Sequence, residues 1–203
     1  MEISENEELD RVIPIIEEIK KKFDIFISID SKKPKVLDHA IKAGAVIAND
    51  ISMLENKEII EIIIKHQVHY VLGHFRKNSS HKNIVPEVLS DLSKKIDILT
   101  ESGFDRRKII LDPGIGFGKN LKHNLMILKK ISVFHSLGFP VLIGVSRKRF
   151  IGQISGPYDT KERLGGTLSS ILFSLSQGVR IFRVHNVEEV KQGILVYEIL
   201  ANR

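Results

Sequence analysis

The spacing of apolar residues divides the chain into two kinds of segment that follow one another. Short continuous apolar runs are typical of strands buried on both faces, and longer segments with apolar residues every three or four positions are typical of helices. The pattern predicts six strands, at residues 25–30, 46–50, 68–74, 108–112, 140–145 and 179–185. It predicts helices at residues 7–22, from 34 onward, at about 57–66 and at 86–102, with further helices between and after the last strands. No stretch has the composition of a linker, so we expect one domain over residues 1–203.

Strands that alternate with helices predict a parallel sheet, either doubly wound or closed into a barrel. Every predicted strand has a polar group at or just past its C-terminal end: Asp30, Asn49, His74, Asp112, Ser146 with Lys148, and Arg183 with His185. A doubly wound sheet gathers ligand contacts at one switch point, whereas a barrel uses the loops of all its strands. The fold class expected is therefore α/β, a TIM-type (β/α)8 barrel. Because such a barrel has about 250 residues, we expect one truncated to about six βα units.

Composition excludes several classes of protein. The chain has no cysteine, so disulfides and thiolate metal sites are excluded, and no HExxH-type metal constellation occurs. No signal peptide or long apolar run appears, which predicts a cytoplasmic protein without membrane contact. The net charge of +6 comes from lysines scattered over predicted helices with few interleaved aromatics. That distribution argues against nucleic acid and suits a small anionic substrate.

The segment from Asp112 to Lys119 ends a buried strand on an acid and continues with three alternating glycines. The glycines predict positive φ angles or close backbone approach to a ligand. The spacing fits neither a P-loop, which needs Ser or Thr after its lysine, nor the dinucleotide fingerprint. A glycine-rich surface turn is the plain alternative, but it does not explain the acid at the strand end.

Each polar strand end also has a structural interpretation. Asp30 could cap the next helix, Asn49 and Asp50 could form a turn, and Lys148 could belong to a solvated basic edge at residues 147–149. Arg183 and His185 are harder to explain in this way. They are two residues apart, so they project from one face, and buried cations need an anion.

Together these groups fit one kind of ligand. Two carboxylates and an amide suit the N–H groups of an amino-substituted heterocycle, and Arg with His suits a diphosphate. The simplest ligand with both features is a flat heterocycle attached to a diphosphate leaving group.

The motifs also resemble those of the dihydropteroate synthase family of pterin-binding barrels, over essentially the whole chain and in the same order. The matching segments are residues 27–30, 49–51, 112–119, 146–148 with Gly152, 162–167 and 183–185. A methyltransferase of the same superfamily is less similar at residues 112–119 and 146–148.

The resemblance implies a transferase of folate biosynthesis that condenses 6-hydroxymethyl-7,8-dihydropterin diphosphate with 4-aminobenzoate, giving 7,8-dihydropteroate and pyrophosphate. It also implies Mg²⁺ as cofactor. By the same resemblance, the pterin-binding residues are Asp30, Asn49, Asp112, Lys148 and Arg183, the diphosphate-binding residues are Arg183 and His185, and the 4-aminobenzoate side is formed by Phe117, Ser146 and Arg147.

Departures from the family pattern limit this expectation. Gly73 stands where Met is usual, Lys32 where a capping Ser is usual, and Asn186 where Asp is usual. The family's two N-terminal βα units, including the Asn that binds the metal, have no counterpart, so no metal ligand is expected in this chain. Three interpretations stay open: a fragment of an ordinary synthase, one half of a split enzyme, or an inactive pterin-binding module. We expect no synthesis of dihydropteroate by the chain alone, and association as a homodimer or with a complementary N-terminal fragment.

Overall fold

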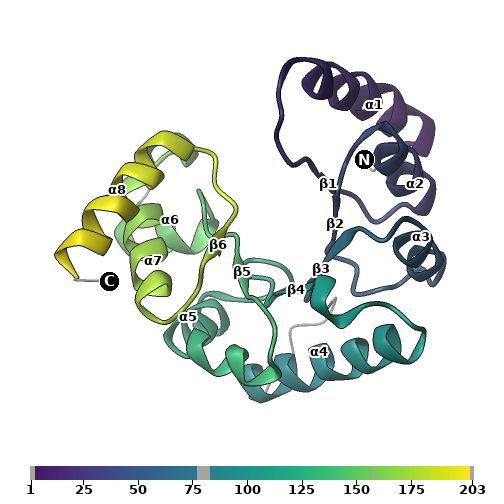
Figure 1. The fold of residues 1–203 in the computed structure, drawn as a ribbon. Helices are drawn as coiled ribbons and strands as arrows, with labels where there is room; N and C mark the ends of the chain where they lie inside the picture. The colour runs from purple at the N-terminus through teal and green to yellow at the C-terminus, as the bar shows by residue number, and fades with distance from the viewer. Residues whose placement is uncertain (1–2, 77–82, 157, 202–203) are drawn as a thin grey trace. The chain divides into compact units, whose positions relative to one another are not determined.

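Strands and helices alternate along the chain as predicted (Figure 1). The computed structural model describes residues 3–76, 83–156 and 158–201. The strands are β1 (Ser28–Asp30), β2 (Ile47–Asp50), β3 (His69–Gly73), β4 (Ile109–Asp112), β5 (Leu142–Ile143) and β6 (Ile181–Phe182). The α-helices are α1 (Glu5–Lys22), α2 (Pro34–Ala43), α3 (Glu58–His66), α4 (Ile84–Glu101), α5 (Leu121–Lys129), α6 (Arg149–Ser155), α7 (Leu164–Ser176) and α8 (Val187–Leu200).

Local chemistry explains where the first helices begin and end. Helix α1 begins two residues earlier than predicted because the Ser4 hydroxyl accepts a hydrogen bond from the Glu7 N–H at 3.1 Å, an N-cap. Pro34 opens α2 as expected, since its missing N–H would have no partner in the first turn. Gly44 ends α2 with φ 121°, a conformation that side chains with a Cβ rarely adopt.

Strands β1 and β2, β2 and β3, and β5 and β6 pair in parallel. In the four-stranded sheet the order is β1-β2-β3-β4, and β5 pairs with β6. Strand β2 lies between β1 and β3, with Asn49 opposite Asp30 on one side and Val71 on the other. Both β5 and β6 are two residues long, much shorter than predicted. One hydrogen bond continues the pairing beyond β6, from the Arg183 N–H to the Ile143 carbonyl at 3.0 Å.

The chain divides into two compact units, residues 1–75 with 91–111 and residues 76–90 with 112–203. Each has its own core. In the first unit, α1 packs on α2 and α2 on α3, around fully buried side chains such as Leu37, Ile59 and Tyr70. In the second unit, α5 packs on α6, α6 on α7 and α7 on α8, with Phe134 and Ile115 fully buried. The expectation of one domain over residues 1–203 stays a prediction.

None of the helices in the described ranges combines the length and the apolar character that crossing a membrane requires.

Candidate functional site

Asp30, the last residue of β1, is exposed at the end of its strand. The alternative that it caps the next helix is wrong, because the N-cap of α2 is Lys33. The short loop between them is held by Ser31, whose hydroxyl accepts from the Lys33 N–H at 3.2 Å. The Asp30 carboxylate is therefore not committed to helix capping.

Asn49 and Asp50 end β2 but have different surroundings. Asp50 is fully buried and is a turn former, since its carboxylate accepts from the N–H groups of Ser52 and Leu54 at 2.7 and 3.1 Å and from the Tyr70 hydroxyl at 2.7 Å. Burial and the adjacent Asp50 raise the pKa of Tyr70 well above its usual value, so the hydroxyl stays a donor. Asn49 is 3% exposed, and its Oδ1 has no hydrogen-bond partner within the described residues. A buried unpaired amide oxygen is costly, and a ligand N–H would satisfy it.

His74, just past β3, is fully buried, and its Nε2 lies 3.2 Å from Asp91 Oδ2 on α4. The sequence places a polar group here correctly. In the structure it has a partner from its own unit, which favours a structural role.

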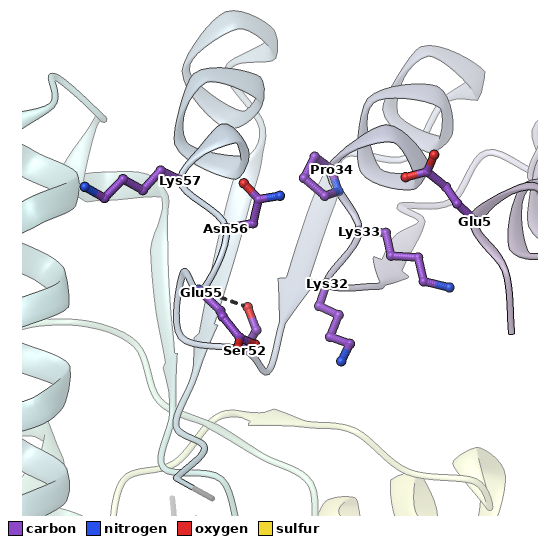
Figure 2. A pocket seen from close by; sticks show the side chains of 8 residues that line it. All are labelled: Glu5, Lys32, Lys33, Pro34, Ser52, Glu55, Asn56 and Lys57. Atoms are coloured by element: carbon purple, nitrogen blue, oxygen red, sulfur yellow. Dashed lines mark hydrogen bonds between the residues drawn. The ribbon is translucent and has the colours of Figure 1, made fainter. Parts of the chain in front are cut away.

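A cavity of about 410 Å³ lies beside the loops that follow β1 and β2 (Figure 2). Three lysines and two glutamates line it. Lys33 is compensated, since its ammonium lies 2.7 Å from Glu8 and donates to the Ile3 carbonyl at 2.6 Å. In Figure 2 the Lys57 side chain points away from Lys33. This cavity therefore has no concentrated charge of one sign.

In the second unit, Asp112 ends β4 with 3% of its surface exposed. Its Oδ1 accepts from the Gly114 N–H at 2.7 Å. Burial raises the pKa of the Asp112 carboxyl above its ordinary value, although Gly114 and the positive charges of Lys119, Arg183 and Lys148 oppose the rise. An acid buried among cations is poised to accept from a ligand N–H.

The glycine-rich loop has the geometry predicted for it. Gly114, Gly116 and Gly118 have φ angles of 71°, 84° and 60°. The Lys119 ammonium donates to the carbonyls of Gly114 and Phe117 at 2.9 and 3.1 Å and so fixes the curve of the loop. The interpretation as a glycine-rich surface turn does not explain these contacts.

Asn124 on α5 fixes the same loop and was not foreseen from the sequence. It is 4% exposed, and its Oδ1 accepts from the Gly116 N–H at 2.7 Å. No motif marks it, because it lies eight residues beyond its partner on the next helix.

Lys148 crosses this loop. Its ammonium lies 3.9 Å from the centroid of the Phe117 ring, a cation–π contact. A Cβ at Gly116 would lie 3.1 Å from Lys148 Cδ, so the glycine leaves room for the lysine. Lys148 is half-buried whereas Arg149 is exposed. The interpretation as a solvated basic edge therefore fits Arg149 and not Lys148.

Arg147 is held in the left-handed conformation, with φ 60°. Its N–H donates to the Thr167 hydroxyl at 3.1 Å, and its carbonyl accepts from Arg163 at 3.1 Å. Its guanidinium donates to Asn186 Oδ1 at 2.8 Å. Thr167 and Arg163 belong to the segment 162–167 that the sequence motifs singled out, but their contacts with Arg147 appear only in the structure.

Ser146 and His185 make two contacts. The Ser146 hydroxyl lies 2.9 Å from His185 Nδ1, and it also accepts a hydrogen bond from the backbone N–H of His185 at 3.3 Å. Both line a cavity of about 450 Å³ together with Arg147, Lys148 and Arg183. The second unit thus brings Arg183 and His185 to one cavity, as their spacing predicted. Within the described residues no Asp or Glu lines it, so the cavity is built for an anion.

Comparison with known proteins agrees with this geometry. Residues 1–185 match the family model of pterin binding enzymes. The dihydropteroate synthase of Bacillus subtilis (strain 168) is 39% identical over 202 residues, which are 99% of this chain and 70% of the relative. The dihydropteroate synthase of Escherichia coli (strain K12) is 37% identical over 206 residues, covering 97% of this chain and 72% of that protein.

Solved structures give the same result. The chain superimposes with a TM-score of 0.96 on dihydropteroate synthase from Clostridium difficile in the presence of pteroic acid, at 33% identity, over 100% of this chain and 78% of that one. The Thermus thermophilus enzyme in complex with 4-aminobenzoate gives a TM-score of 0.93 at 32% identity, over 98% and 79%.

The chain therefore belongs to the pterin binding enzyme family, whose α/β fold is of the TIM-barrel type. Its function within that family is that of a dihydropteroate synthase, a transferase of folate biosynthesis. The family, the fold class and the function predicted from the sequence are confirmed.

Proposed function

We propose that the residues assigned from the sequence bind the substrates of dihydropteroate synthesis. In the second unit, Asp112, Lys148 and Arg183 bind the pterin ring. Asp30 and Asn49, in the first unit, keep the pterin assignment that the family resemblance implies. Arg183 and His185 bind the diphosphate, and Phe117, Ser146 and Arg147 face 4-aminobenzoate. The proposal rests above all on the cavity of the second unit. Basic side chains line this cavity, and within the described part of the chain no Asp or Glu does.

The pterin part of the proposal rests on two buried acceptors. Asp112 is buried beside cations, and the Asn49 Oδ1 has no partner within the described residues. Each acceptor, considered within its own unit, matches a ligand N–H group, which requires a buried acceptor.

In the reaction, the amine nitrogen of 4-aminobenzoate forms a bond to the exocyclic methylene carbon of the pterin. The carbon–oxygen bond to the diphosphate breaks, its electron pair leaves with pyrophosphate, and the new amine loses a proton to solvent. The Asp112 carboxylate stabilises positive charge that develops on the pterin. Arg183 and His185 stabilise negative charge on the leaving group.

The family resemblance implies magnesium as a cofactor. Among the residues that the structure describes, no group of three His, Asp or Glu side chains gathers as a metal site. The described residues therefore do not form a site that would hold a metal ion by themselves.

Calorimetric titration with the dihydropterin diphosphate tests the proposal. We expect binding by the wild-type chain and a loss of about ten- to a hundredfold in Asp112→Ala, because a charge-assisted partner is removed. Unchanged affinity in Asp112→Ala would reject the pterin assignment. Release of pyrophosphate with 4-aminobenzoate then separates a complete enzyme from a pterin-binding module or half of a split synthase.

A homodimer is part of the same proposal. Helix α8 exposes several large apolar side chains, among them Val196, Ile199 and Leu200. Exposed apolar groups clustered on one helix favour association, and sedimentation equilibrium tests it. A cytoplasmic location stays a prediction.

A further inference from the structure

Residues 145–148 form a β-turn between β5 and α6, closed by a hydrogen bond from the Lys148 N–H to the Val145 carbonyl at 3.2 Å. The third residue of this turn, Arg147, has φ 60°, whereas the φ of the second, Ser146, is not positive. This is the pattern of a type II turn, whose third position favours glycine. An arginine there costs conformational energy, because its Cβ crowds the backbone in the left-handed region.

The turn carries side chains of the candidate site. Ser146, Arg147 and Lys148 all line the cavity of about 450 Å³. Ser146 contacts His185, and the Lys148 ammonium lies over the ring of Phe117. A non-glycine residue in the left-handed region persists only where its surroundings hold it there, and such residues cluster at functional sites. The contacts that hold Arg147 therefore also determine where its two neighbours lie.

Arg163, which directly precedes α7, supplies one of these contacts. Its Nη1 donates to the Arg147 carbonyl at 3.1 Å, while its Nε and Nη2 donate to the Tyr158 carbonyl at 3.3 and 3.1 Å. One planar guanidinium thus connects the turn to the loop between α6 and α7, which the single ammonium of a lysine cannot reproduce. The buried Thr167 accepts from the Arg147 N–H at 3.1 Å, so both polar backbone groups of Arg147 are bound to this segment.

Gly152 in α6 makes room for the guanidinium of Arg163. A Cβ at this position would lie 3.1 Å from Arg163 Nε and 3.2 Å from Nη2, so the guanidinium would have to shift by a few tenths of an ångström. Gly165 in α7 differs, since a Cβ there would meet no atom within 4 Å. The close approach at Gly152 therefore restricts where the Arg163 guanidinium lies.

We propose that Arg163 is a positioning residue for pterin binding: through the Arg147 carbonyl it holds the 145–148 turn in the left-handed form that an arginine disfavours, and so fixes the ammonium of Lys148. Arg163 acts through the turn and not by contact with the ligand. The inference rests on the proposed function, since it takes the pterin as the ligand of Lys148. It adds a residue to that function and a physical reason for an arginine at this position.

Arg163→Lys keeps the charge and removes the fork of donors, so it isolates the geometry of the contact. By calorimetric titration with 6-hydroxymethyl-7,8-dihydropterin diphosphate, we expect its affinity to fall roughly three- to tenfold. In an Arg147→Gly background the same substitution should change the affinity by less than about twofold, because glycine adopts a positive φ without support. Equal losses in the two backgrounds would overturn the proposal.

Gly152→Ala displaces the guanidinium without altering it, and Gly165→Ala is its matched control. Gly152→Ala should lower the affinity for the same ligand about two- to fivefold. Gly165→Ala should leave the affinity unchanged, since its methyl group enters open space. Equal affinities in the two variants would show that the position of the guanidinium does not matter to the site, and would overturn the proposal.

Urea unfolding separates the inference from the proposed function because it needs no ligand. Arg163→Lys should lower the free energy of unfolding of the wild-type chain more than that of Arg147→Gly. A wild-type chain that shows this difference but does not bind the dihydropterin diphosphate overturns the proposed function, and with it the role of Arg163 in pterin binding. Binding by the wild-type chain that Arg163→Lys leaves unchanged, whatever its effect on stability, overturns the role of Arg163 alone.

Discussion

The ammonium of Lys148 lies over the ring of Phe117, 3.9 Å from its centroid, although the two residues are 31 positions apart in the sequence. One belongs to the glycine-rich loop after β4 and the other directly precedes α6. The aromatic ring holds the cation without neutralising it, because the attraction is to the quadrupole of the ring. The same positive charge also acts on the buried carboxyl of Asp112.

Replacing Lys148 by Met tests this arrangement. The substitution retains most of the apolar stem and deletes the charge, so we expect pterin affinity to fall about ten- to a hundredfold with an unaltered circular-dichroism spectrum. Calorimetry measures the affinity. If the spectrum collapses instead, Lys148 is a structural residue and its assignment to the pterin is wrong.

Asp112→Asn should change how the free energy of unfolding depends on pH. Burial raises the pKa of the Asp112 carboxyl above its ordinary value of 3.8, so the folded chain holds this proton more tightly than the unfolded chain. The contribution of this carboxyl to stability is then greatest below pH 3.8 and falls as the pH rises through the folded pKa. Because Asn keeps an oxygen for the Gly114 N–H but never ionises, the variant should be more stable than wild type at about pH 7 and similar at about pH 3. Urea unfolding at both values measures this, and a wild type that stays the more stable near neutral pH would show that the neighbouring cations outweigh burial.

Asn124→Ala should loosen the glycine-rich loop. It removes the acceptor of the Gly116 N–H in a partly buried hydrogen bond, at a cost of about 1 kcal/mol in the free energy of unfolding. Pterin affinity should fall as well, since Gly116 lies against Lys148. Asn124→Asp keeps the acceptor oxygen and is the control. Equal losses in the two variants would contradict the role of the Gly116 contact.

Asp38 links α2 to α3 and should make the first unit sensitive to acid. Hydrogen bonds from Lys42 and then His66 lower the pKa of this carboxyl to about 2. A lowered pKa contributes stability that is complete above pH 3.8 and is lost as the pH falls toward about 2. Asp38→Asn should therefore cost about 1–2 kcal/mol at about pH 7 and almost nothing at about pH 2. Urea unfolding across this range checks it, and a loss that is the same at every pH would mean that the charge of Asp38 contributes nothing.

The sequence predicted what depends on local pattern. The order of six strands, the helix that opens at Pro34 and the positive φ angles of Gly114, Gly116 and Gly118 follow from hydrophobic periodicity and from the limits that a Cβ places on the backbone. Parallel strands also place their C-terminal polar residues on one edge of a sheet, which is why Asp112 could be recognised as a site residue.

The tertiary structure decided which of those polar groups are already used and which remain available to a ligand. Asp50 and Asn49 are adjacent and look alike in the sequence, yet Asp50 is saturated by Tyr70 and the loop that follows it, whereas the Oδ1 of Asn49 has no partner within the described residues. The anchors Asn124, Thr167 and Asn186 likewise come from other helices or their first turns, at separations that no periodic pattern records. Hydrogen bonding between distant segments depends on the packing that brings them together, so the sequence determined the chemistry that this chain carries and the fold determined which part of it is left for a ligand.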